Sequence, residues 1–241
     1  YWTSSEAVKA SFDHARKEWT VHVRRDGKDV VVKPKHLVFA TGSYGPPREV
    51  TIPGQVEFEG IQYHSAKHQS AAALAGKRCI VLGANSSAHD ICADLWENGA
   101  EATMIQRTPT TVVRSETLMD VAFGGLYSEE AVEKGIDVDT ADMIFASMPF
   151  RLMPALQKPL YAEMARRDAD LLERLNKAGF QTDFGPDGSG LMMKALRTGS
   201  GYYIDVGCSE LIARGEVKVR SGVEIARVNK RSVILTDGSE L

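Results

Sequence analysis

The sequence predicts an α/β protein in which parallel strands alternate with helices. The first observation is a short apolar run, "RCIVLG", that begins after Lys77 and ends in a glycine, as a strand-to-helix turn requires. The second is a stretch with one apolar stripe at helical spacing, formed by Ala88, Ile91, Cys92 and Leu95. The third is another apolar run, "EATMIQR", which a right-handed crossover makes parallel to the first.

The residues before this unit follow a different pattern. "WTVHVRR" alternates apolar and polar residues, "DGK" follows as a turn, and "DVVVKP" returns, which predicts a β-hairpin. The continuously apolar run "HLVFATG" (residues 36–42) predicts a buried strand that ends in a glycine turn at Thr41 and Gly42. Prolines in "SYGPPREVTIPGQ" then predict an extended, irregular connection between domains.

The ends of the first helix of the α/β unit are also marked. Ser87 with Asp90 three residues later predicts a capping box, and Gly99 predicts the C-terminal stop. His89 is expected on the polar side of this helix, in contact with solvent.

Residues 108–201 form a helix-rich block. "DTADMIFASM" predicts one helix, and "LQKPLYAEMARRDADLLERLNKAGF" a second, mostly from Pro159 onward and ending at Gly179. The methionine-containing loop "FGPDGSGLMMKAL" lines a substrate path or packs in the core, and core packing is the commoner role of methionine. After the block, "YYIDVG" predicts a strand, "CSELIARG" a short helix, and the remaining residues strands with turns.

The domain organisation follows from a repeated pattern. The tail "VEIARVNKRSVILTDG" resembles the first hairpin, but the chain ends before a third strand. We therefore expect an internal fragment with two related domains. Residues 1–75 would be the C-terminal part of one dinucleotide-binding domain with its linker. Residues 76–241 would be a Rossmann-like three-layer domain with a helical insertion at about 111–200.

Composition limits the possible partners. The net charge is −3 and the basic residues are scattered, so neither nucleic acid nor an anionic membrane is an expected partner. No apolar run approaches the roughly 20 residues that span a bilayer, and a cytoplasmic location is expected. Three widely spaced cysteines (Cys79, Cys92 and Cys208) predict reduced thiols rather than disulfides or a zinc site.

The predicted strand-to-helix turn carries a dinucleotide-binding pattern with substitutions. Gly83 provides the tight turn, Asn85 stands at the second glycine position, and Ala88 replaces the third glycine, where a small side chain suffices. Ser86 and Ser87 place hydroxyl groups at the start of the helix, where they cap it or bind phosphate.

The end of the second strand indicates which dinucleotide is bound. An NAD site has a carboxylate there, roughly 20 residues after the glycines, whereas this chain has Gln106, Arg107 and Thr108. A guanidinium binds the 2′-phosphate of NADPH through paired hydrogen bonds, so NADPH is favoured over NADH. The alternative is that Arg107 is an ordinary surface arginine.

"FEGIQYHSAKH" (residues 58–68) resembles the fingerprint F-x-G-x-x-x-H-x-x-x-(Y/F) of the flavin-containing monooxygenases, with Phe58, Gly60 and His64 in register and His68 replacing the final aromatic residue. "LVFATG" resembles the strand that closes on the flavin domain of that family. "GANSSAHDICADLWENGAEATMIQRTPT" resembles the NADPH-binding segment of a microbial, fungal-like subgroup, and "FGPDGSGLMMKAL" and "GYYIDVGCSELIARG" are similar to that subgroup too.

This resemblance implies an NADPH- and FAD-dependent monooxygenase that transfers one oxygen atom of O2 to a small organic substrate. It implies that the glycine turn and its serines hold the pyrophosphate and ribose of NADPH, that Arg107 and Thr108 hold the 2′-phosphate, and that Thr41 and Gly42 lie at the flavin. It places His64 near the cofactor, and a hydrogen bond from His64 to the backbone is an equal alternative. No glycine-rich FAD fingerprint occurs in the chain, so the fragment alone is expected to be inactive.

Two other functions stay open. One is a non-catalytic NADP(H)-binding module, and the other is a flavin-dependent pyridine-nucleotide reductase, although the C-x-x-C pair typical of disulfide reductases is absent. His64 and His68 are four residues apart, but no third ligand accompanies them, so no metal site is expected. Homo-oligomer formation and the identity of the substrate are not determined by these patterns.

Overall fold

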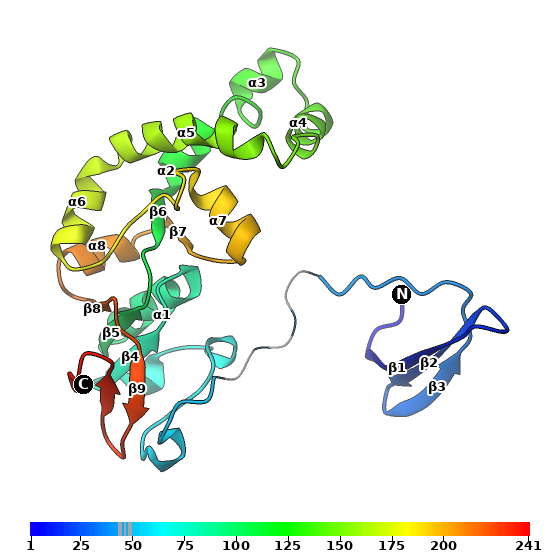
Figure 1. Cartoon of the computed structure of the whole chain (residues 1–241), viewed down its shortest axis with the longest axis horizontal. Coiled ribbons are helices and arrows are strands. Elements are labelled where there is room, and N and C mark those ends of the chain that lie inside the picture. The colour runs from blue at the N-terminus through cyan, green and yellow to red at the C-terminus, as the bar shows by residue number, and fades with distance from the viewer. Residues whose placement is uncertain (43–44, 46, 48–49) are drawn as a thin grey trace. The chain divides into compact units, whose positions relative to one another are not determined.

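The computed structural model describes residues 1–42, 45, 47 and 50–241, and the chain divides into two compact units, residues 1–48 and 49–241 (Figure 1). The predicted irregular connection at residues 43–55 lies partly outside the described residues; its described part contains no strand, and residues 55–57 form a short 3-10 helix (η1, Gln55–Glu57).

The first unit is a three-stranded antiparallel sheet in the order β1-β2-β3. Strands β2 (Glu18–Arg25) and β3 (Lys28–Val32) confirm the predicted hairpin, whereas β1 (Ser5–Asp13), which pairs with β2, was not predicted. Strand β1 has almost no buried side chain, and therefore lacked the alternating pattern that identifies a strand in a sequence.

The predicted buried strand at residues 36–42 is wrong for this structure. These residues are not part of a strand, and the side chains of Val38 and Phe39 are 82% and 73% exposed. An apolar run becomes a buried strand only where a neighbouring strand supplies hydrogen bonds and a packed layer covers it, and the described residues supply neither.

The second unit is built on a parallel sheet of β4 (Arg78–Leu82), β5 (Glu101–Gln106) and β8 (Lys218–Ser221), in the order β4-β5-β8. Helix α1 (Ser86–Glu97) links β4 to β5, which confirms the predicted strand–helix–strand unit and its parallel pairing. Gly99, with φ of 76°, follows the helix as predicted.

Side chains alternate between the two faces of this sheet. Cys79, Val81, Ala102 and Met104 pack in one core with α1 and α8 (Cys208–Ala213). Ile80 and Ile105 point to the other face, where the antiparallel hairpin of β9 (Ile225–Val228) and β10 (Val233–Leu235) and residues Ile52 and Phe58 cover them. The result is a three-layer Rossmann-like fold in which a hairpin, not a helix, forms the third layer.

The helical block rests on a second parallel pair, β6 (Thr111–Arg114) and β7 (Tyr202–Asp205). Strand β7 was predicted and β6 was not. Between them lie α2 (Ser115–Leu118), the π-helical turn η4 (Met119–Phe123), α3 (Glu129–Glu133), α4 (Val138–Ala146), α5 (Met153–Arg167), α6 (Ala169–Lys177) and α7 (Gly190–Thr198). Figure 1 shows α5 continuing into α6 along the block, with α3 and α4 at its far end.

Two predictions for this block need correction. The long helix begins at Met153, not near Pro159, and it is divided at Asp168, whose buried carboxylate accepts hydrogen bonds from the Arg114 backbone and the Thr117 hydroxyl. The predicted loop at residues 184–196 becomes helix α7 from Gly190. Met193 in that helix is fully buried, in agreement with a core role.

Candidate functional site

The turn after β4 brings the backbone of the first strand tightly against the start of α1. Gly83 has φ of 134°, which strongly favours glycine, and its N–H donates to the carbonyl of Ile105 at 3.0 Å. A Cβ atom at Gly83 would lie 3.8 Å from the Cβ of Ala88, which is ordinary contact. The glycine is therefore required by its backbone conformation more than by space.

Asn85 is the N-cap residue of α1. Its carbonyl accepts from the N–H groups of Ala88 and His89, at 2.9 and 3.1 Å, while its side chain makes no capping hydrogen bond. The predicted capping box of Ser87 and Asp90 is wrong, because the helix begins at Ser86 and Ser87 is already inside its first turn.

The first two N–H groups of α1 are available to a ligand. Within the described part of the chain, no hydrogen bond uses the backbone N–H of Ser86 or Ser87. The Ser86 hydroxyl contacts the Tyr202 carbonyl at 3.4 Å, and Ser87 is exposed. Two free N–H groups at the positive end of a 12-residue helix form a site that attracts an anion.

A second strand-to-helix turn in the same unit has N–H groups that are already hydrogen-bonded to a side chain. The carboxylate of Asp205, at the end of β7, accepts from the N–H groups of Gly207 and Ser209 at 3.0 and 3.2 Å, at the start of α8. The chain's own carboxylate therefore occupies the place of an anion at that turn, whereas at the Gly83 turn no side chain does so.

Arg107 and Thr108 follow β5 at the same edge of the sheet as Gly83, and both are exposed. The Arg107 guanidinium lies 3.3 Å from a carboxylate oxygen of Glu224, and the two side chains are 73% and 55% exposed. An ion pair this exposed contributes little stability, so the guanidinium can exchange its partner for another anion.

Gln106, the last residue of β5, is a central residue of this edge, and its structural role was not predicted from the sequence. It is fully buried, and its amide bonds to the backbone N–H and carbonyl of Gln181 at 2.8 and 2.9 Å and to the hydroxyls of Ser221 and Thr110. Thr110 in turn donates to the Ala84 carbonyl at 2.9 Å. These bonds fix the loop that carries Arg107 to the glycine turn. The sequence feature that could have identified Gln106 is a polar residue at the end of an otherwise apolar strand.

His89 is not in contact with solvent, contrary to expectation. Its ring is fully buried, stacks on Tyr203 and meets Phe180 edge-on. Its Nδ1 lies 3.0 Å from the Asn85 carbonyl, and its Nε2 has no hydrogen-bond partner in the described chain. Burial lowers the pKa of His89 to about 4, although the hydrogen bond to Asn85 and the Asp205 carboxylate act in the opposite direction. His89 is therefore a neutral residue that packs under the turn.

The segment before β4 carries the predicted fingerprint. The ring of Phe58 lies against Gly60, where a Cβ atom would be 2.4 Å from the ring, so the pairing of these two residues has a steric cause. Nδ1 of His64 accepts a hydrogen bond from the backbone N–H of Ala66 at 3.1 Å, as expected for the alternative in which His64 bonds to the backbone. A contact between His64 and a cofactor stays a prediction. His68 bonds to the Asp94 carboxylate at 2.7 Å and so attaches the segment to α1.

The other two predicted cofactor positions belong to the first unit. Thr41 and Gly42 belong to the first unit and are exposed, and their role at a flavin stays a prediction. All three cysteines are free. Over the described ranges, no group of three or more potential metal ligands is found, and no helix is long and apolar enough to cross a membrane.

Comparisons with known proteins identify the relatives of this chain. The sequence profile of the pyridine nucleotide-disulphide oxidoreductase family matches residues 7–141, more than half of the chain. The chain is 27% identical over 235 residues to indole-3-pyruvate monooxygenase YUCCA1 of Oryza sativa, covering 96% of this chain and 50% of that protein. It is 30% identical over 138 residues to a Baeyer-Villiger monooxygenase of Streptomyces coelicolor, covering 56% of this chain and 24% of that one.

Solved structures show the same fold. Cyclohexanone monooxygenase with bound ε-caprolactone aligns over 98% of this chain and 51% of its own, with a TM-score of 0.62 at 20% identity. OTEMO in complex with FAD and NADP aligns over 98% of this chain and 50% of its own, with a TM-score of 0.62 at 18% identity. The chain thus spans about half the length of the relatives that it matches most fully.

Proposed function

Because the chain belongs to the pyridine nucleotide-disulphide oxidoreductase family and, with its relatives, to the class B flavin monooxygenases, we propose that it is the NADPH-binding portion of an FAD-dependent monooxygenase. In the whole protein, NADPH would supply the reducing equivalents to the flavin, and one oxygen atom of O2 would pass to a small organic substrate. The part of the protein described here would hold and orient the nicotinamide nucleotide.

One observation carries this proposal. At the carboxyl edge of the parallel sheet, the Gly83 turn presents the unbonded N–H groups of Ser86 and Ser87, and Arg107 is exposed at the end of the neighbouring strand. The pyrophosphate would bind at the helix N-terminus and the 2′-phosphate at the guanidinium, with Thr108 beside it. The position that discriminates against a 2′-phosphate in NAD enzymes has no carboxylate here.

Glu224 is the residue that works against this assignment, because its carboxylate already pairs with Arg107. A 2′-phosphate carries more charge than one carboxylate and offers three oxygens to the planar guanidinium, so it competes favourably for the same group. NADPH would displace Glu224, which is free to turn toward solvent.

The flavin does not fit the described residues alone. The second strand-to-helix turn, at Gly207, is closed by Asp205, so the described chain offers one open pyrophosphate site, and the proposal assigns it to NADPH. A role for Thr41 and Gly42 at the flavin is part of the proposal for the whole protein.

Isothermal titration of the chain with NADPH and NADH tests the assignment. NADPH should bind more tightly, and Arg107→Ala should lower its affinity by about tenfold or more, to the level of NADH, through loss of a charge-assisted contact. Arg231→Ala is the matched control, because Arg231 is another exposed arginine paired to a glutamate, Glu59, and should leave both affinities unchanged.

Equal binding of NADPH and NADH by the unmodified chain would count against the proposal. The non-catalytic alternative is tested on the whole protein: a flavin spectrum and NADPH-dependent oxygen uptake support the monooxygenase, whereas NADP(H) binding without either supports a binding module. A flavin-dependent reductase would consume NADPH with an added electron acceptor and transfer no oxygen atom to a substrate.

A further inference from the structure

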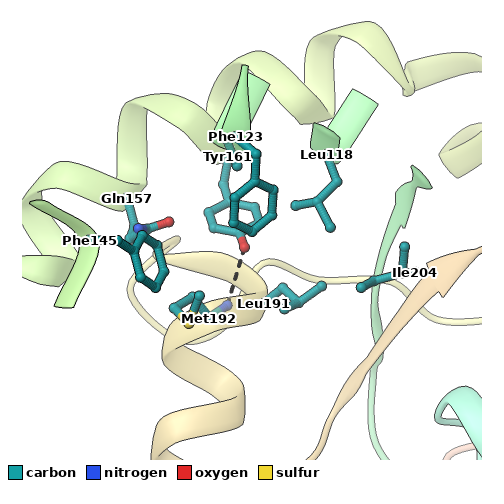
Figure 2. A pocket seen from close by; sticks show the side chains of 9 residues that line it. Leu118, Phe123, Phe145, Gln157, Tyr161, Leu191, Met192 and Ile204 are labelled. Atoms are coloured by element: carbon teal, nitrogen blue, oxygen red, sulfur yellow. Dashed lines mark hydrogen bonds between the residues drawn. The ribbon is translucent and has the colours of Figure 1, made fainter. Parts of the chain in front are cut away.

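The helical block has a hydrophobic core of its own, separate from the core of the parallel sheet. Its fully buried members are Val113, Leu118, Tyr161, Met164 and Leu191. This small core encloses a cavity of about 110 Å³ between α2–η4, α5, α7 and β7, shown in Figure 2. The volume is of the order of the roughly 150 Å³ at which an engineered apolar cavity accepts benzene.

The wall of the cavity is almost wholly apolar. Leu118, Leu191 and Ile204 supply aliphatic surface, and Phe123 and Phe145 supply ring surface. No charged side chain lines it, so an ion would lose its hydration without gaining a partner. The wall therefore selects a neutral molecule.

Two polar groups interrupt this wall, and both come from the same face of α5. Gln157 and Tyr161 are four residues apart on the helix and are 6% and 2% exposed. The Tyr161 oxygen accepts from the N–H of Met192 at 3.2 Å, so its own hydroxyl proton remains to be donated. Among the described residues the Gln157 amide has no hydrogen-bond partner, and it is not sealed off from small molecules, so a molecule in the cavity can reach it.

A side-chain amide in a mostly apolar wall binds best to a molecule that offers it a hydrogen-bond partner. Figure 2 shows the Gln157 amide beside the ring of Phe145 and the Tyr161 hydroxyl directed toward Met192. A ligand that placed one oxygen between the amide and the hydroxyl would bond to both while its ring filled the apolar space.

We propose that this cavity binds a neutral one-ring molecule that carries a single hydroxyl or carbonyl oxygen. The ring packs against Phe123, Phe145 and Leu191, and the oxygen faces Gln157 and Tyr161. This site shares no residue with the Gly83 turn, so it goes beyond the proposed nucleotide function and does not depend on it. Phe145 and Met192 are only partly buried, and they mark the side from which the ligand enters.

Titration of the full chain with phenol, and separately with benzene, tests the proposal, with binding followed by NMR shifts of the methyl groups that line the cavity. Phenol should bind saturably. Ala122→Leu, which fills the cavity, should weaken phenol binding by about tenfold or more. Ala155→Leu places the same side chain at an exposed position of α5 and should leave binding unchanged.

Gln157→Leu separates the polar contact from the apolar one. It should weaken phenol binding several-fold and leave benzene binding equal or stronger, because the amide contributes only to the ligand with an oxygen. It also keeps the test decisive should Ala122→Leu fail to fold. Absence of saturable phenol binding by the folded chain, equal phenol affinity in Ala122→Leu, or equal loss of phenol and benzene in Gln157→Leu would each overturn the proposal. The affinity for NADPH should be the same in all these variants, so a change in phenol binding can be distinguished from a failure of the proposed nucleotide site.

Discussion

The imidazole of His89 stacks on the phenol ring of Tyr203, with ring centroids 3.8 Å apart and planes 9° from parallel. His89 lies in the first turns of α1 and Tyr203 in β7, so this contact joins the helix that follows the Gly83 turn to the strand on which the helical block rests. The two rings are fully buried, and the contact therefore depends on a neutral imidazole.

We expect the stability of the second unit to fall as the pH drops from about 6.5 to about 4. Unfolded His89 takes up a proton near pH 6.5, whereas burial holds its pKa at about 4 in the folded chain, so over this interval the unfolded state binds more protons. The free energy of unfolding should decrease by about 3 kcal/mol in total. Urea denaturation at several pH values, followed by circular dichroism, measures it.

The matched variants are His89→Phe, which keeps a ring on Tyr203, and His22→Phe at an exposed position of β2. The first should lose most of the pH dependence in this interval, and the second should keep it. An unchanged slope in His89→Phe would show that other groups cause the dependence.

Gly190→Ala should destabilise the helical block strongly. Gly190 has φ of 70°, and an added Cβ atom would lie 2.2 Å from Cγ of the Tyr161 ring, so backbone strain and overlap act together. We expect a loss of roughly 2–4 kcal/mol in the free energy of unfolding. Gly188→Ala is the control, because φ is 73° there and nothing lies within 4 Å of the added atom. Equal losses in the two variants would mean that the Tyr161 contact carries no cost.

Gln106→Leu should also lower the free energy of unfolding, by about 1–3 kcal/mol, since it leaves the backbone N–H of Gln181 without the oxygen that accepts its hydrogen bond. NADPH affinity should fall as well, because the loop that carries Arg107 loses its attachment. Gln62→Leu, at an exposed position, should change neither quantity. Calorimetric melting and NADPH titration of the two variants provide the measurements.

Glu224→Gln should increase the affinity for NADPH by up to about fivefold and leave the affinity for NADH unchanged, since an exposed ion pair is worth roughly 0.2–1 kcal/mol. The gain should shrink as salt is added, because both charges are exposed to screening. Glu216→Gln, which removes another exposed carboxylate paired to an arginine, should have no effect on either nucleotide. A similar gain for NADH would place the 2′-phosphate elsewhere.

The sequence was sufficient where a pattern is local. The strand from Arg78 to Leu82, the helix from Ser86 to Glu97 and the parallel strand after it were all predicted, because hydrophobic periodicity and glycine punctuation encode them within about 30 residues. The fingerprint from Phe58 to His64 was sufficient for the family, which the comparisons show.

The errors arose where the outcome depends on distant partners. The apolar run at residues 36–42 has the composition of a buried strand, yet no described neighbour pairs with it. The long helix divides at Asp168 because Arg114 and Thr117, more than 50 positions earlier, hold that carboxylate. His89 was expected to be solvated because Phe180 and Tyr203, which bury it, lie more than 90 positions later in the sequence.

By itself, the sequence determined the fold class, the family and the glycine turn at the start of the proposed nucleotide site, because each depends on short-range periodicity, backbone freedom or a compact motif. Only the tertiary structure decided which helix end stays open to an anion, which carboxylate pairs with Arg107, and that the helical block contains a small apolar cavity lined by the polar side chains of Gln157 and Tyr161. Those features come from contacts between residues that are far apart along the chain. Secondary-structure propensity depends on a local stretch of sequence, whereas packing depends on residues from several distant stretches.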